Sequence, residues 1–86
     1  MPRPMTLELL DTLRIVDDDV TAVLDAYLSD PAHGPVVIGE GYRIDPAPAV
    51  AGQPFAATLM RQPWASDELR RAAVRAAIQL AEPERV

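Results

Sequence analysis

The sequence contains no cysteine, lysine or asparagine, and it has only one histidine. The absence of cysteine excludes disulfides and zinc sites built on thiolates. One histidine alone cannot hold a transition metal, so such a site would need carboxylates from elsewhere in the chain. We therefore expect no metal and no cofactor. The all-arginine basic set, with abundant alanine, proline and aspartate, is typical of a GC-rich bacterial or phage coding sequence.

Long apolar runs are also missing. No segment reaches about 18 consecutive apolar residues, the length that indicates a membrane-spanning helix. The first residues, Met1-Pro2-Arg3-Pro4, are soon followed by acidic residues and lack the apolar core of a signal peptide. These features predict a cytoplasmic protein that does not associate with membranes.

The length and charge limit what the chain can be. Its 86 residues predict a single small domain (residues 1–86), which buries roughly 60–65% of its unfolded surface, so self-association would be a useful source of further burial. The net charge of −5 divides into −6 over residues 1–45 and +1 over residues 46–86. An acidic chain repels phosphates, which disfavours general nucleic-acid binding and leaves only a local basic face for it.

The first half of the chain has a helical pattern of apolar residues. A heptad seam with spacings of 4, 3, 4, 3 and 4 is formed by Leu9, Leu13, Val16, Val20, Val23 and Tyr27. Asp11, Asp18 and Asp25 keep the outermost position opposite this seam. The shared phase predicts one long amphipathic helix over residues 6–29. The alternative is two shorter helices, the second capped by Asp18 or Asp19.

The length of this helix bears on assembly. A helix of 24 residues is about 36 Å long, whereas a compact domain of this size is about 30 Å across. Either the helix breaks, or a second copy or another subunit covers the part that extends beyond the domain. We expect the seam to be buried partly by such a partner.

The middle of the chain is rich in proline and glycine. Two β-prone triplets flank Gly39-Glu40-Gly41, which predicts a hairpin over residues 35–45, with a single bulged strand as the alternative. Residues 46–54 read as an extended proline–alanine connector. Residues 53–60 fit either a strand or a short helix that starts at Pro54.

The last segment predicts an alanine-rich helix over residues 66–81, with Ser66 as its N-cap. Its apolar stripe consists of Leu69, Ala72, Ala73, Ala76, Ala77 and Leu80. Val74, Ile78 and Ala81 widen the stripe beyond what one packing contact needs, so we expect this helix to pack on two sides. The expected fold is α+β, with a long N-terminal helix and this helix around a small β-hairpin and a proline-rich middle.

Sites for catalysis or metal binding are weakly indicated. His33 lies in a short loop with Ser29 and Asp30, and neighbouring loop residues do not normally converge as a catalytic triad. The run of residues 17–19, Asp-Asp-Asp, lacks the spacing of a calcium loop. Glu40 and Asp45 form a possible carboxylate pair with no sign of a buried site.

Two features could serve binding. Arg70, Arg71 and Arg75 form a basic cluster, with Arg61 nearby, which is either neutralised by Asp67 and Glu68 on the same helix or docks an acidic partner. Among the large residues Phe55, Met60 and Trp64, Trp64 is either a lid over the alanine-rich helix or a binding hot spot.

These patterns favour a non-enzymatic protein-interaction or assembly module. It would self-associate or serve as a small accessory or structural subunit of a larger complex, as phage structural, antitoxin-like and immunity proteins do. One variant is an acidic protein that binds a basic target. The first alternative is a small-ligand-binding or regulatory subunit of an enzyme, and the second is nucleic-acid binding through the arginine cluster.

Overall fold

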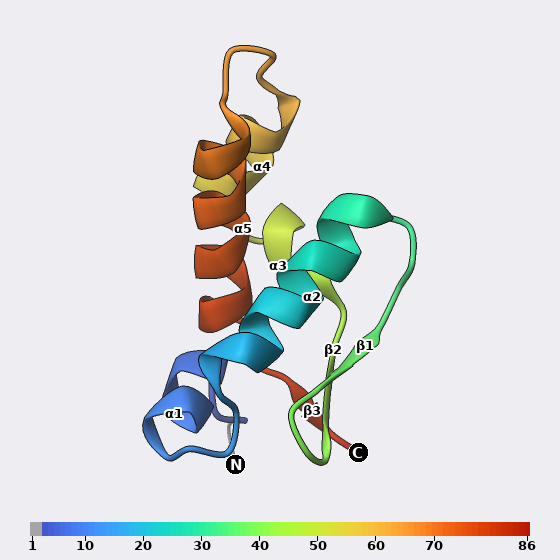
Figure 1. Cartoon of the computed structure of the whole chain (residues 1–86), viewed down its shortest axis with the longest axis vertical. Helices are drawn as coiled ribbons and strands as arrows, with labels where there is room; N and C mark the ends of the chain where they lie inside the picture. The colour runs from blue at the N-terminus through green and yellow to red at the C-terminus, as the bar shows by residue number, and fades with distance from the viewer. Residues whose placement is uncertain (1–2) are drawn as a thin grey trace.

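The computed structural model describes residues 3–86, which form five helices and one three-stranded sheet (Figure 1). The helices are α1 (Thr6–Asp11), α2 (Asp17–Ser29), α3 (Pro46–Ala51), α4 (Pro54–Arg61) and α5 (Asp67–Leu80). The strands are β1 (Val36–Ile38), β2 (Tyr42–Ile44) and β3 (Glu84–Arg85). The fold is therefore α+β, as predicted. Within residues 3–86, no helix is both long enough and apolar enough to cross a membrane.

The helix α5 contacts each of the other four helices, and Figure 1 shows it as the long column beside which they are arranged. It begins where the sequence predicts, because the Ser66 hydroxyl accepts the Leu69 N–H at 3.1 Å and Asp67 and Glu68 occupy its positive first turn. The predicted helix over residues 66–81 is confirmed to within one residue at each end.

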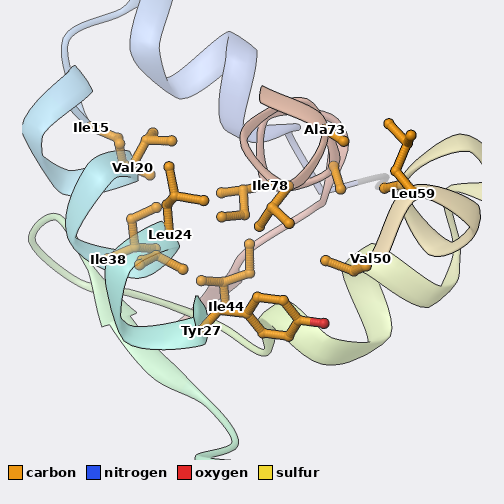
Figure 2. Close-up of a cluster of buried hydrophobic side chains, with 14 of the residues drawn as sticks. Ile15, Val20, Leu24, Tyr27, Ile38, Ile44, Val50, Leu59, Ala73 and Ile78 are labelled. Carbon is orange, nitrogen blue, oxygen red and sulfur yellow. The ribbon is translucent and has the colours of Figure 1, made fainter. Parts of the chain in front are cut away.

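The core is one cluster of apolar side chains around the inner side of α5. In Figure 2, Ile78 of α5 faces Leu24 of α2, and Ile44 of β2 lies close below. The ring of Tyr27 points from α2 toward Val50 of α3. Burying each large aliphatic side chain contributes about 1.5–3 kcal/mol, so this cluster is the main source of stability in a chain without disulfides.

The predicted hairpin is confirmed. β1 and β2 pair antiparallel, with Val37 opposite Arg43, and the connecting turn contains Gly39 and Gly41 at positive φ. β3 then pairs with the other edge of β2, which gives the order β1-β2-β3. The side chains of β2 alternate: Tyr42 and Ile44 enter the core, whereas Arg43 faces out.

The prediction of one continuous helix over residues 6–29 is wrong, because this segment forms two helices, α1 and α2. The cause is Ile15. In one straight helix Ile15 would lie on the polar side, near Asp11 and Asp18, but the break places it in the core with none of its surface exposed. In exchange, Leu13 and Val16 leave the seam and are 80% and 48% exposed. The two-helix alternative is the correct one.

The break has a defined backbone geometry. Leu13 adopts a left-handed conformation with φ of 61°, and the Arg14 and Leu13 N–H groups donate to the Leu9 and Leu10 carbonyls at 2.9 and 3.1 Å. These two bonds form a Schellman motif, with leucine at the position that usually holds glycine. The second helix then begins at Asp17, with Val16 rather than Asp18 or Asp19 as its N-cap residue. Asp19 is the third helical residue, and its carboxylate accepts the Val16 N–H at 3.0 Å.

The hairpin turn packs on this break. A Cβ atom at Gly39 would lie 3.0 Å from Ile15 Cγ1 and 3.1 Å from the Arg14 carbonyl oxygen. Gly39 also has a φ of 62°. Both the close approach and the backbone conformation therefore require glycine at this position.

The prediction of an extended connector over residues 46–54 is also wrong, because residues 46–51 form the short helix α3. Its Pro46 and Pro48 lie in the first turn, where N–H groups have no partner within the helix, so proline removes nothing that the helix uses. The undecided segment that follows is helical, and α4 starts at Pro54 for the same reason.

The start of α1 is tied to the end of α5. The Thr6 N–H and hydroxyl both donate to the Ala81 carbonyl, at 2.8 and 3.2 Å. Thr6 is fully buried, and this carbonyl belongs to the end of a helix, where acceptors lack partners within the helix. The two bonds therefore satisfy polar groups at both helix ends.

Leu13→Gly is expected to stabilise the protein. A left-handed conformation costs a residue other than glycine about 1–2 kcal/mol, and Leu13→Gly would remove this strain. Glycine loses more backbone entropy on folding, which opposes the gain by about 0.5–1 kcal/mol. The net gain in the free energy of unfolding should be about 0.5–1 kcal/mol, measured by urea denaturation. Leu7→Gly, within α1, should instead destabilise. A loss of stability in Leu13→Gly equal to that in Leu7→Gly would contradict the assigned geometry.

Candidate interaction surfaces

The predicted arginine cluster is used inside the molecule. Arg71 Nη1 pairs with Asp25 Oδ1 at 2.8 Å, and Arg75 Nη2 donates to the Thr21 hydroxyl at 2.8 Å. Both bonds join α5 to α2. Arg70 Nη2 donates to the Gln62 carbonyl at 2.6 Å, while its buried Nε has no partner. The bonding partners of Arg71 and Arg75 are therefore Asp25 and Thr21 of α2, distant in sequence, rather than Asp67 and Glu68 of the same helix.

The predicted seam is mostly the protein's own core. Leu9, Val20, Val23 and Tyr27 are buried, against α5 and the hairpin among others, whereas Leu13 and Val16 are exposed at the break. The buried residues need no partner chain to cover them. Of the expected interaction residues in this half, only Leu13 and Val16 are accessible.

The large residues of the proline-rich half differ in burial. Met60 packs against the core, but Phe55 and Trp64 are each 69% exposed. Trp64 therefore does not form a lid over α5. It lies in the loop between α4 and α5, accessible to another molecule, as the hot-spot interpretation requires.

The polar candidates stay apart. His33 is exposed, and its backbone N–H donates to the Asp30 backbone carbonyl at 3.0 Å in a turn. Glu40 and Asp45 line different grooves, so they form no carboxylate pair. Over residues 3–86, the structure brings together no group of three or more side chains that could hold a metal.

The alanine-rich stripe of α5 has a buried half and an exposed half. Ala73, Val74, Ala77 and Ile78 enter the core. The exposed half, the α5 outer face, is formed by Leu69, Ala72, Ala76 and Leu80. Leu69 and Leu80 at its ends are 36% and 43% exposed. The unusual breadth of the stripe in the sequence was the signal for this second face.

A groove begins at one end of the α5 outer face. It has a volume of about 640 Å³ and lies between the end of α5, α3, β2 and the segment that leads into β3. Its apolar lining includes Leu80, Ala77, Ile44 and Pro48. Its charged lining consists of Arg3, Arg43, Asp45, Glu82 and Glu84. We call it the α5–α3 groove.

Two of these charges share one partner. Glu84 accepts a 2.9 Å bond from Arg43 Nη2 and lies 3.3 Å from Arg3 Nη1. The hydrogen bond and charge of Arg43, followed by the charge of Arg3, hold the pKa of Glu84 below its ordinary value. Both arginines of the groove are therefore engaged with a carboxylate of the same chain.

Asp45 has a different environment. Its Oδ1 is buried without a hydrogen-bond partner. Asp45 is the N-cap residue of α3, but its side chain makes no capping bond. An N-cap side chain normally accepts from the second or third helical residue, and the third here is Pro48, which has no N–H. The prolines that start α3 thus leave this carboxylate with few donors.

A second groove lies at the hairpin turn. It has a volume of about 610 Å³ and its lining includes Leu13, Arg14, Glu40, Arg85 and Val86. The exposed Leu13 side chain is therefore held at its edge by the strained backbone of the break. Its charges are balanced, with no excess of one sign that would select a ligand.

Comparison with protein-family models, curated proteins and solved structures found no match to this chain.

The ion pair between Arg71 and Asp25 is expected to stabilise the packing of α5 on α2. Both side chains are partly exposed, so a double-mutant cycle of Arg71→Gln and Asp25→Asn should give a coupling of about 0.2–1 kcal/mol. The coupling should fall as salt is raised. A coupling indistinguishable from zero at low salt would show that Arg71 does not hold α2.

Arg43→Gln is expected to raise the pKa of Glu84 more than Arg3→Gln does, because Arg43 is the stronger influence on this carboxylate. The pKa can be followed by NMR of the Glu84 carboxyl carbon. Since the pKa is lowered in the folded state, these pairs stabilise the fold above the unfolded pKa of Glu84, and that contribution is lost as the pH falls through the folded value. Equal shifts in the two variants would contradict the assignment.

Proposed function

We propose that this chain is a non-enzymatic protein-interaction module, a cytoplasmic subunit that docks another protein, or a second copy of itself, on the α5 outer face. The observation that supports this most directly is the exposure of Leu69, Ala72, Ala76 and Leu80 along one side of a 14-residue helix. The opposite side of the same helix is fully used by the core.

The composition of this face suits helix packing. The residues follow one another at spacings of 3, 4 and 4, so they form a continuous ridge. Alanine at the two central positions lets the backbone of a partner approach to about 8 Å between axes, the lower limit for packed helices. Leu69 and Leu80 can then pack beyond the crossing point, where each gains burial.

A second candidate function is small-ligand binding as a regulatory subunit. The α5–α3 groove supports it, because 640 Å³ falls within the range of about 300–1,000 Å³ typical of ligand pockets. Nucleic-acid binding has less support, since Arg70, Arg71 and Arg75 bond within the chain.

Ala72→Glu combined with Ala76→Glu is expected to abolish the association while leaving the fold intact. Both side chains are exposed, and glutamate is nearly as good a helix former as alanine. Sedimentation velocity of the purified 9.3 kDa chain tests self-association, and mass spectrometry of proteins that co-purify from the native host identifies another partner.

The matched control is Ala22→Glu with Ala51→Glu, which adds the same charge at exposed alanines of α2 and α3. Circular dichroism should show equal helix content in the two double variants. The proposal fails if the complex survives the α5 changes, or if the control disrupts it to the same extent.

A further inference from the structure

The α5–α3 groove continues the α5 outer face, because Leu80 belongs to both. A helix or segment that docks across Leu80 therefore lies beside the mouth of the groove. Its near wall is apolar, with Ala77 and Leu80 from α5 and Pro48 from α3. The chemistry of the far wall depends on the charged residues.

The available charge in the groove is negative. Three acids and two arginines line it, and both arginines pair with Glu84. Asp45 and Glu82 form no ion pair with any part of residues 3–86. The whole chain also has a net charge of −5, which attracts cationic partners and repels anionic ones.

The carboxylate of Asp45 is the group that gains most from a cation. Its Oδ1 is removed from solvent with no donor in exchange, and burying a charged group in this way is costly unless an opposite charge or a donor compensates. A cation that reaches the other oxygen of the carboxylate would offset this cost, because the negative charge is shared by both oxygens. Bonds of this kind are stronger than those between neutral groups.

We infer that the α5–α3 groove accepts an arginine or lysine side chain of a partner protein that docks on the α5 outer face. This inference rests on the proposed function and specifies the chemistry of the partner. The methylene stem of the side chain lies along Ala77, Leu80 and Pro48, and its charged end pairs with Asp45, with Glu82 adding to the negative potential. Long basic side chains combine these two properties, which the groove offers together.

The inference is tested with side-chain mimics: N-acetyl-arginine amide and its neutral isostere N-acetyl-citrulline amide, titrated into the ¹⁵N-labelled full chain. Arginine should shift the amide signals of Asp45, Ala77 and Ala81, and bind up to about five-fold more tightly than citrulline, as a partly exposed ion pair provides. This preference should decrease with added NaCl. Equal affinity for the two mimics would overturn the inference.

Charge variants locate the site. Asp45→Asn should remove the preference for arginine, and because the Asp45 side chain makes no capping bond, α3 should be retained. Glu82→Gln should weaken binding partially. Asp11→Asn, which removes the same charge from an exposed position of α1, should leave binding unchanged. Loss of the preference in Asp11→Asn, or its persistence in Asp45→Asn, would show that net charge or another site is responsible.

The double variant Ala72→Glu/Ala76→Glu separates this inference from the proposed function. Its groove residues are unchanged, so it should still bind N-acetyl-arginine amide. If the mimic fails to bind the unmodified chain while the complex still depends on Ala72 and Ala76, the groove inference is wrong and the docking surface remains.

Discussion

The fold depends on the burial of one side of α5. Val74 and Ile78 have no exposed surface, and the helices that cover them come from both the N-terminal half and the proline-rich middle. A chain of 86 residues without disulfides has few other ways to hold these segments together. The same packing explains the free surface, because the elements gather on one side of α5 and leave Leu69, Ala72, Ala76 and Leu80 uncovered.

Charged side chains have two roles in this arrangement. Arg71 and Arg75 connect α5 to α2 through bonds to Asp25 and Thr21, and Glu84 joins β3 to β2 through Arg43. These groups support the fold and are not free for a partner. Asp45 differs, since it lies between β2 and α3 and neither element supplies a hydrogen-bond donor to its buried Oδ1. The group that we propose for binding, Asp45, is therefore distinguished by its unpartnered oxygen rather than by its charge alone.

The elements that depend on neighbouring residues could be predicted from the sequence. The Ser66 cap, the alanine stripe and the glycine turn are set by neighbouring residues, so α5 and the hairpin followed from the sequence. The break at Leu13 did not, because it depends on Ile15 entering a core built by distant segments, although an isoleucine among aspartates was a visible sign of it. In the candidate site, the breadth of the α5 stripe indicated an apolar face beyond the one that a single packing contact needs. The partners of Arg71 and Arg75 lie 46 and 54 residues away, beyond what helical spacing could show.

The bonds from Thr6 to Ala81 also bear on the order in which the chain folds. They join residues 75 positions apart, and closing a long loop costs entropy that local contacts do not. Helices α4 and α5 are neighbours in sequence and pack together directly, so we expect this helical hairpin to form early. We expect helix α1 to dock after α5 has formed. Until α1 docks, the Ala81 carbonyl would accept a hydrogen bond from water in place of Thr6, so we expect the C-terminal end of α5 to reach its native state late.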